Sequence, residues 1–460
     1  MIAVLILGAI IFGYLFFYKV EIVAVIFFTL TIADINIDVP GLPMKLRAAL
    51  GILLFLRVII DPANKKMPSF FRLQSNLLLL MFIGYFFLVS WGTDSITFDI
   101  VKVLLLIIFS AYSAYFFYFK YGDYRILKTA IILSSLICFA DLLYTYAVVG
   151  QFPITRIIDV YVNGGPIETD EYVEVNHNFY GCICGIAYSI ILNDYLTKKN
   201  TFKFEIALMP VYFMGVLMST SRSSLLGLIA ITIMLVFYGI KDKENARRYY
   251  KILGMSFSII VVVIFGFIAA QSMFDLDAEF LESITYRLTE EPVAVIKKNL
   301  GYSYNVNDLD AMDWRAESAE IAYNVFINLP TPSKLFGVGY GTYLQDNLGH
   351  NGLNPHNGIL LLLIEGGMFG MLIYVILLGG EMTKSLRYFR FSSLFLCVVF
   401  MIFYSLGQNE ELSSATMFLF VISMSCENFS EIVLKKKKRH IINKDETEYE
   451  KTTYELASKI

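Results

Sequence analysis

The sequence predicts an all-α, polytopic membrane protein, and its composition and hydropathy pattern both support this fold class. Of its 460 residues, 57% are hydrophobic and only 17% are charged, and the mean hydropathy is +0.62. Soluble domains carry about 25% charged residues, so this chain has more apolar sequence than a soluble core could bury. Apolar stretches that could cross a bilayer as helices recur along most of the chain. We therefore expect about 12–13 transmembrane helices and one long extracytoplasmic loop.

The candidate spans are apolar segments bounded by polar or charged residues. Several are shorter than the roughly 20 residues of a perpendicular span, and those near residues 48 and 206 fit tilted or re-entrant helices, which leaves the count open by about one or two. The first segment lacks the basic start of a signal peptide and is expected to remain as a span. In chain order the segments are residues 2–18, 20–33, 48–60, 77–91, 100–119, 129–149, 179–192, 206–218, 225–240, 252–270, 359–378, 392–406 and 414–426.

Lysine and arginine gather in alternate loops, and this asymmetry predicts the orientation of the chain. The loops near residues 94–99 and 168–174 carry acidic residues and few basic ones, so they are expected outside. The basic loops and the basic tail are expected in the cytoplasm. The basic residues concerned are Lys65, Lys66, Arg72, Lys120, Arg125, Lys128, Lys198, Lys199, Lys203, Lys241, Lys243, Arg247, Arg248, Lys251, Lys384, Arg387, Arg390 and, in the tail, Lys435, Lys436, Lys437, Lys438 and Arg439.

This orientation divides the chain into four regions. Residues 1–270 are expected to form transmembrane helices with short loops, and residues 271–357 an extracytoplasmic catalytic loop. Residues 358–429 would form the C-terminal transmembrane helices, and residues 430–460 a basic, then mixed-charge cytoplasmic tail. The five cysteines all lie in apolar stretches and are interpreted as small buried hydrophobic residues. The sequence contains no zinc pattern and no phosphate-binding P-loop.

Arg222 lies in a serine-rich turn between two apolar segments. An arginine at the centre of a span costs about 2.5–3.5 kcal/mol, and less near an interface, so an anionic partner is expected. The alternative is an arginine that extends its charged end to the membrane surface.

Arg315 lies at the start of a predicted helix in the long external loop, within Asp313-Trp314-Arg315-Ala316-Glu317. Its guanidinium group either pairs with a neighbouring carboxylate, or stays uncovered beside the small residues Ala319 and Ala322. The apolar positions that predict the helix are Met312, Ala316, Ala319, Tyr323 and Phe326.

His356 lies in Asn354-Pro355-His356-Asn357-Gly358, immediately before an apolar segment. Asn354 is a candidate helix cap with Pro355 at the first helical position, which would place His356 in the first turn. The helix dipole would then favour a neutral imidazole that can accept a proton, although the same residue could simply cap the helix. Earlier in the loop, Gly337, Gly339 and Gly341 predict a tight bend at which the backbone closely approaches another group.

Five elements in this order resemble the O-antigen ligase and O-antigen polymerase superfamily. The resemblance covers roughly residues 218–378, and Asn176-His177-Asn178 is similar to an Asn-rich element that precedes a span in the same family. The five elements are Ser221-Arg222, Trp314-Arg315, Leu335-Phe336-Gly337-Val338-Gly339, His356-Asn357 and Glu365-Gly366-Gly367-Met368-Phe369-Gly370.

The resemblance implies an integral-membrane glycosyltransferase of the C type, which uses sugar donors on undecaprenyl pyrophosphate and needs neither a metal nor another cofactor. It implies that Arg222 and Arg315 hold the donor pyrophosphate and that His356 acts on the acceptor hydroxyl. Two guanidinium groups can stabilise the leaving diphosphate without Mg²⁺, and a neutral histidine can act as the base. Further predicted substrate-binding residues are Gly337, Gly339, Tyr340, Asn357, His177 and Asn178, with Asp313 and Glu317 as secondary candidates.

The predicted function is therefore a polymerase of lipid-linked oligosaccharide repeat units in the bacterial cytoplasmic membrane. One alternative is a ligase that transfers the glycan to another acceptor. A different class, a transporter or lipid-linked sugar flippase, normally has short loops and a binding site at mid-membrane, which the long loop fits poorly. The expected partners are the undecaprenyl-pyrophosphate-linked oligosaccharide, the lipid bilayer and, as a candidate, a chain-length regulator. No nucleic acid is expected.

Overall fold

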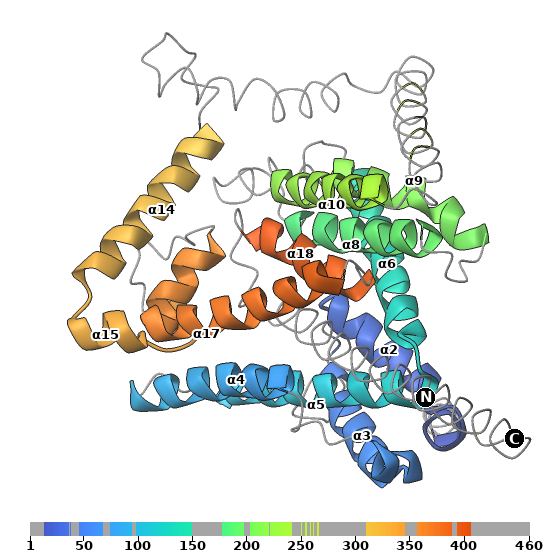
Figure 1. Cartoon of the computed structure of the whole chain (residues 1–460), viewed down its shortest axis with the longest axis horizontal. Coiled ribbons are helices and arrows are strands. Elements are labelled where there is room, and N and C mark those ends of the chain that lie inside the picture. The colour runs from blue at the N-terminus through green and yellow to red at the C-terminus, as the bar shows by residue number, and fades with distance from the viewer. Residues whose placement is uncertain are drawn as a thin grey trace, which may run out of the picture.

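The computed structural model describes the helical parts of the chain. The residues described are 13–35, 37, 46–67, 74–93, 98–149, 177–196, 203–219, 221–241, 310–345, 357–388 and 393–405, together with 250, 254, 258, 261 and 265. Within these ranges the regular structure is helical and contains no strand, so the predicted all-α class is confirmed (Figure 1).

The helices closely follow the predicted apolar segments. Three of the described helices contain windows that are long and apolar enough to cross a membrane, namely Leu104–Tyr121, Arg125–Tyr144 and Gly358–Gly380, and shorter apolar helices accompany them. The predicted spans 252–270 and 414–426 lie outside the described residues, apart from single positions in the first. The helices that overlap predicted spans are α2 (Val20–Ile32), α3 (Leu46–Ile60), α4 (Gln74–Gly92), α5 (Phe98–Tyr121), α6 (Arg125–Val149), α8 (His177–Leu196), α9 (Lys203–Met218), α10 (Arg222–Lys241), α17 (Gly358–Tyr388) and α18 (Ser393–Ser405).

Helix α8 is the centre of a packed group of helices that we call the bundle, formed by α6, α8, α9, α10 and α18. Residues 181–194 of α8 are all buried, as expected for a helix that is apolar on every side. Phe400 of α18 fits between two glycines: a Cβ atom at Gly185 would lie 2.3 Å from its ring, and one at Gly227 would lie 3.1 Å away. The absence of side chains at these glycines therefore lets α18 approach α8 and α10.

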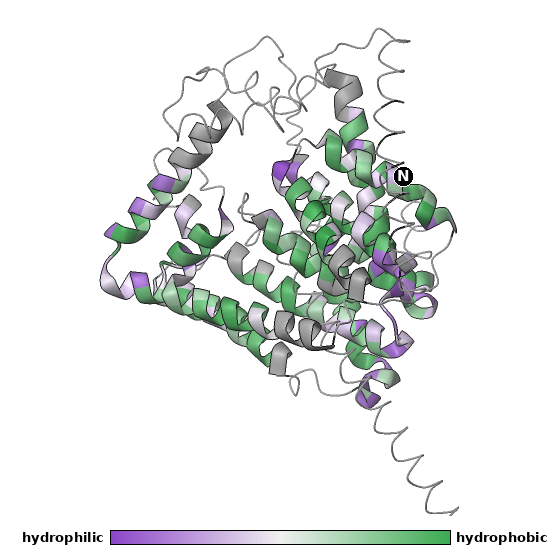
Figure 2. Cartoon of the chain, turned by 45° about the horizontal axis from the view of Figure 1, so that its top comes forward, coloured by the Kyte–Doolittle hydropathy of each residue, from purple (hydrophilic) through white to green (hydrophobic). Residues whose placement is uncertain are grey.

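A second group, which we call the arm, consists of α4, α17 and the helices of the loop predicted to be external, α14 (Asp310–Asn328), α15 (Thr331–Phe336) and α16 (Thr342–Gln345). Helix α17 contacts each of the others, and it meets α18 where the arm joins the bundle. Figure 1 shows α14 and α15 at one side of the molecule, with α17 running from them towards α18. Hydrophobic residues dominate most helices, whereas α14 carries several hydrophilic ones (Figure 2).

The helix predicted around Arg315 is present as α14. Ser318 and Ala322 are buried, and Val325 and Phe326 pack against the core, whereas Tyr323 is 53% exposed. Helix α14 contacts α17. Position 315 falls on the same stripe as Ser318 and Ala322, one turn earlier.

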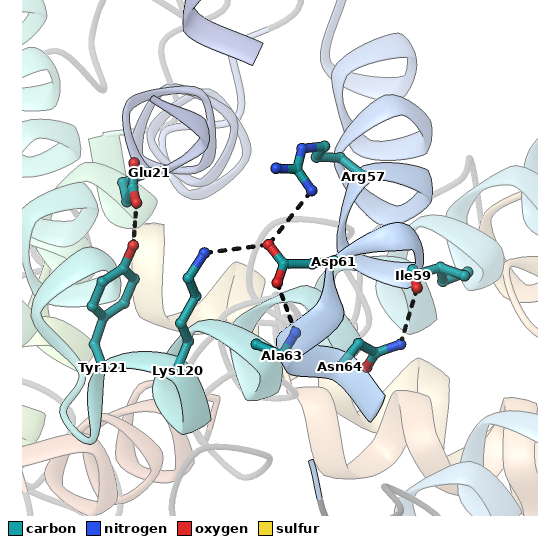
Figure 3. A network of polar contacts seen from close by, with 8 residues as sticks. All are labelled: Glu21, Arg57, Ile59, Asp61, Ala63, Asn64, Lys120 and Tyr121. Carbon is teal, nitrogen blue, oxygen red and sulfur yellow. Dashed lines mark hydrogen bonds and ion pairs between the residues drawn. The ribbon is translucent and has the colours of Figure 1, made fainter. Parts of the chain in front are cut away.

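Charged residues from the predicted cytoplasmic loops meet at one end of the molecule. The Asp61 carboxylate lies 3.3 Å from Lys120 Nζ and 3.4 Å from Arg57 Nη1 (Figure 3). Lys128 Nζ lies 2.7 Å from the Glu205 carboxylate and 3.1 Å from that of Asp194. Three of the predicted basic loops thus lie together, which agrees with their predicted alternation, while the side of the membrane remains a prediction. A short 3₁₀ helix, η1 (Pro62–Lys66), follows Asp61.

The four cysteines within the described ranges, Cys138, Cys182, Cys184 and Cys397, are buried thiols. This agrees with their interpretation as small hydrophobic residues; Cys426 lies outside the described residues.

Candidate functional site

Arg222 is the first residue of α10, and the serine-rich turn before it forms the helix cap. Ser221 Oγ accepts a hydrogen bond from the Ser224 backbone N–H at 3.3 Å, as an N-cap side chain does. Ser219 directly follows α9, and its Oγ atom accepts a hydrogen bond from the Ser221 backbone N–H, also at 3.3 Å. The guanidinium group is partly buried, with its Nη1 atom shielded from solvent. The turn therefore fixes the position at which this arginine enters the bundle.

The first turn of α8, which contains His177 and Asn178, lies directly beside the start of α10. Ser224 Oγ lies 3.3 Å from the Asn178 carbonyl oxygen. A Cβ atom at Gly181 would lie 2.1 Å from Ser219 Oγ, so a glycine is needed where α8 meets the turn. The structure thus brings three predicted site positions, 177, 178 and 222, to one end of the bundle. The His177 side chain lies outside the described part.

Two further contacts place polar groups at this end of the bundle. Tyr180 donates a hydrogen bond of 2.7 Å to the Asp141 carboxylate of α6. Arg47, just inside α3, pairs with Asp34, which follows α2. Asp61 follows the other end of α3, so the Asp61 cluster and the Arg47 contact lie at opposite ends of that helix.

The glycines at 337 and 339 belong to a backbone contact with α17 that we call the junction, formed by residues 337–343 and Glu365-Gly366-Gly367. Helix α17 is kinked at Gly367, whose φ of 64° and ψ of −172° are not helical. A kink interrupts the regular hydrogen bonds of a helix. The N–H groups of Val338 and Gly339 donate instead to the carbonyl oxygens of Ile364 and Glu365, each at 3.1 Å.

Close backbone approach makes glycine necessary on both sides of the junction. A Cβ atom at Gly337 would lie 2.2 Å from the Glu365 carbonyl oxygen, and one at Gly367 would lie 2.4 Å from the Gly337 nitrogen. Both residues have positive φ angles, of 86° and 64°, which side chains other than glycine rarely adopt. The predicted tight bend is confirmed, and the group that it approaches is α17. A substrate contact of Gly337 or Gly339 stays a prediction.

Tyr340 is held in the junction by α4. Its backbone N–H donates to Ser90 Oγ at 2.8 Å, and its ring packs edge-on against Phe86, with 6.2 Å between the ring centroids. Burial raises the pKa of Tyr340, and the nearby Glu365 carboxylate acts in the same direction. The hydroxyl is protonated at neutral pH, as an ordinary tyrosine is, and can donate a hydrogen bond. Its predicted contact with a sugar remains untested.

Asn357, rather than Asn354, caps α17. Its Oδ1 atom accepts hydrogen bonds from the N–H groups of Ile359 at 3.0 Å and Leu360 at 3.2 Å, and the helix begins at Gly358. The predicted cap was wrong because the Asn357 side chain can satisfy these two N–H groups and so begins the helix one turn later. His356 therefore precedes the cap instead of lying in the first turn, which removes part of the dipole argument for its neutrality.

Of the three predicted catalytic residues, the structure describes Arg222, only the backbone of Arg315 and no part of His356. The backbone of Arg315 lies in α14, which packs on α17, but its side chain is outside the described residues, as is the whole of His356. The convergence of Arg222, Arg315 and His356 thus remains a prediction. No group of three or more side chains suited to hold a metal ion occurs in the parts of the chain that the structure describes.

Sequence reasoning assigned no role to Tyr85, Ser90 or Glu365, all of which hold the junction. Tyr85 Oη lies 2.9 Å from the Phe336 carbonyl oxygen and 2.8 Å from that of Gly366. A lone carboxylate inside an apolar span was the available signal for Glu365, because ionisable residues in membranes are costly unless they have a task.

Apolar helices whose charged and polar contacts gather at their ends define an integral membrane protein of the all-α class. Residues 207–375 match the family model described as O-Antigen ligase, which supports the predicted resemblance to the O-antigen ligase and polymerase superfamily. The matched segment runs from α9 to α17 and contains Arg222, Arg315 and His356. It supports an O-antigen ligase or polymerase type of function and a glycosyltransferase-like activity. No curated protein and no solved structure matches the chain significantly.

Proposed function

We propose that this protein is a glycosyltransferase of the bacterial cytoplasmic membrane that polymerises oligosaccharide repeat units carried on undecaprenyl pyrophosphate. The observation that carries the proposal is the family match over residues 207–375, because one matched segment contains both candidate arginines and the candidate histidine. The match supports a function of the O-antigen ligase or polymerase type. The undecaprenyl pyrophosphate carrier and the polymerase activity are our inference.

The arrangement of α8 and α10 suits the diphosphate of such a donor. Both helices begin at the same end of the bundle, where Ser224 lies against Asn178. Helix N-termini carry partial positive charge and exposed N–H groups, and both favour a bound phosphate. Arg222, at the first position of α10, adds a full positive charge at this place. We place the donor diphosphate here, with Arg315 approaching from α14.

The reaction needs a base and stabilisation of a leaving group. His356 takes the proton from an acceptor hydroxyl, whose oxygen forms a bond to the anomeric carbon of the donor sugar. The bond from that carbon to the diphosphate oxygen breaks, and undecaprenyl diphosphate leaves with the electron pair. The two guanidinium groups stabilise the charge that develops on the diphosphate, which is how the reaction would proceed without a metal.

A ligase is the second candidate, because the matched family model is described as O-Antigen ligase. A ligase would use the same donor, base and arginines, and would differ in the acceptor. The two functions therefore predict the same effects of substitutions at Arg222, Arg315 and His356 and different products.

The test is a product analysis with the purified full-length protein in lipid nanodiscs. It receives an undecaprenyl-pyrophosphate-linked repeat unit and no ATP, ion gradient or added metal. Carrier lipids bearing two or more repeat units support the polymerase. Transfer only after a second acceptor is added supports the ligase, and movement of the lipid across a bilayer without any new glycosidic bond contradicts both.

A further inference from the structure

Glu365 is a buried carboxylic acid in the apolar first part of α17. Its exposed fraction is 1%, and it lies within the candidate membrane span Gly358–Gly380. Carboxyl groups at such positions are unfavourable unless they have hydrogen-bond partners, and they commonly mark functional sites.

The partners of the Glu365 carboxylate are main-chain groups of the external loop. The backbone N–H groups of Gly341 and Tyr343 donate to it. Through these two N–H groups the carboxylate contacts the path of the backbone at residues 341–343.

Most N–H groups of the junction have a partner on α17 or α4. Those of Val338 and Gly339 donate to carbonyl oxygens at the kink of α17, and that of Tyr340 donates to Ser90 Oγ. The N–H groups of Gly341 and Tyr343 donate to the Glu365 carboxylate. The N–H group of Thr342 donates to the Gly339 carbonyl oxygen at 3.4 Å. A buried N–H group without a partner is costly, and the N–H groups of residues 338–343 all have partners, so these contacts hold this stretch of backbone in one position.

The junction connects the elements that carry two of the predicted catalytic residues. Helices α14 and α15 immediately precede it, α14 also packs on α17, and Ser318 and Ala322 of α14 are buried. Helix α17 begins directly after Asn357, about two turns or roughly 10 Å before Glu365. The helix of Arg315 and the residue that follows His356 are thus joined to one rigid element.

We propose that Glu365 is a positioning residue that sets the distance between Arg315 and His356 by clamping residues 341–343 onto α17. This inference rests on the proposed function, since it assigns both residues to one reaction. Glu365 does not touch the substrates in this scheme. It acts by holding the end of the external loop against the kinked helix.

The first test measures the clamp without using activity. Hydrogen exchange is followed in the full-length protein in nanodiscs, for wild type, Glu365→Leu and Glu365→Gln. Because leucine removes both acceptor oxygens and glutamine keeps one, we expect the amides of residues 341–343 to exchange about 10- to 100-fold faster in the leucine variant, and less fast in the glutamine variant. Glu205→Gln is the matched control, since it neutralises a carboxylate bound to Lys128 at the opposite end, and it should leave these amides unchanged.

The second test separates positioning from stability. The rate of glycosidic-bond formation at saturating substrate is measured per folded molecule. We expect this rate to fall at least about 10-fold in Glu365→Leu and less in Glu365→Gln. In Glu205→Gln it should equal the wild-type rate. A structural role alone would lower the amount of folded protein and leave the rate per folded molecule unchanged. If Glu365→Leu does not fold, Glu365→Gln decides both tests.

Wild-type exchange in the folded variants overturns the clamp, and a wild-type rate per folded molecule overturns the positioning role. If the wild-type protein forms no glycosidic bond while Glu365→Leu shows fast exchange, the clamp is confirmed and the proposed function, and with it the positioning role, is wrong. The two failures are therefore distinguishable.

Discussion

The bundle and the arm are assembled by different kinds of contact. In the bundle, side chains pack into the space beside glycines, as the Phe400 ring does between Gly185 and Gly227. In the arm, backbone groups meet directly, and the glycines at 337 and 367 bring main-chain atoms together. Arg222 belongs to the bundle and Arg315 to the arm, so the proposed site combines one arginine from each. A substitution should therefore have different effects depending on which kind of contact it removes.

The largest expected effect comes from removing one arginine of each region. Arg222→Ala and Arg315→Ala should each lower transfer by at least about 100-fold, because each removes a charged group that stabilises the leaving diphosphate. His356→Ala should be equally severe, since the acceptor loses its base. Polymer formed in cells is measured relative to the amount of protein in the membrane. Wild-type glycan from all three variants would overturn the assignment of the site.

The next effect contrasts a glycine of each region. Gly367→Ala introduces a Cβ atom against the backbone of Gly337 at a positive φ, and should lower the free energy of unfolding by about 3 kcal/mol or more. Gly185→Ala meets only the Phe400 ring, which can move, and should cost about 1–3 kcal/mol. Thermal unfolding of the purified variants gives the order. Equal losses in the free energy of unfolding would mean that the two regions accommodate a new side chain equally well, and would contradict this prediction.

A smaller effect is expected from removing one tyrosine hydroxyl in each region. Tyr85→Phe leaves carbonyl oxygens of the junction with fewer donors, and Tyr212→Phe does the same to the Ile132 carbonyl, which its hydroxyl meets at 3.2 Å in the bundle. Each should cost about 1–3 kcal/mol. Only Tyr85→Phe should speed hydrogen exchange of residues 337–343. Faster exchange there in Tyr212→Phe would show that the regions are coupled.

The smallest effect concerns Asp61, at the far end from the proposed site. Burial works to raise its pKa, but the Ala63 N–H, Lys120 and Arg57 outweigh this, so the pKa is lowered from its ordinary value of 3.8. A lowered pKa in the folded state stabilises the fold above the ordinary pKa, and this contribution is lost as pH falls through the folded value. The difference in unfolding midpoint between wild type and Asp61→Asn should thus be present at pH 7 and shrink below about pH 4. A difference independent of pH would contradict the charge interaction.

The helices were predictable from the sequence, and the junction was not. Apolar runs bounded by charges placed helices such as α6 and α9 within a few residues, because in a bilayer burial and hydrogen bonding both favour the same segments. The glycines of the loop correctly predicted a close approach, but their partner lies on another helix and leaves no local signal. The kink at Gly367 was hidden for the same reason, since Gly366-Gly367 can also occur inside a regular helix.

The sequence identified the types of residue in the candidate site more successfully than it placed them in space. The serine-rich turn and Arg222 lie beside Asn178, which the order of motifs had grouped together. The start of α17 was misplaced, because Asn354 and Asn357 are equally good caps by residue type and only the chain path decides between them. The helix around Arg315 was predicted from the spacing of its apolar residues and is present as α14.

The break in α17 also bears on how the chain enters the membrane. A helix interrupted at Gly367 presents bare carbonyl groups to lipid unless something covers them, and the cover is supplied by residues 338 and 339, which leave the ribosome earlier. We therefore expect an order in membrane insertion: the predicted external loop folds back onto α17 before the last helices settle in the hydrocarbon.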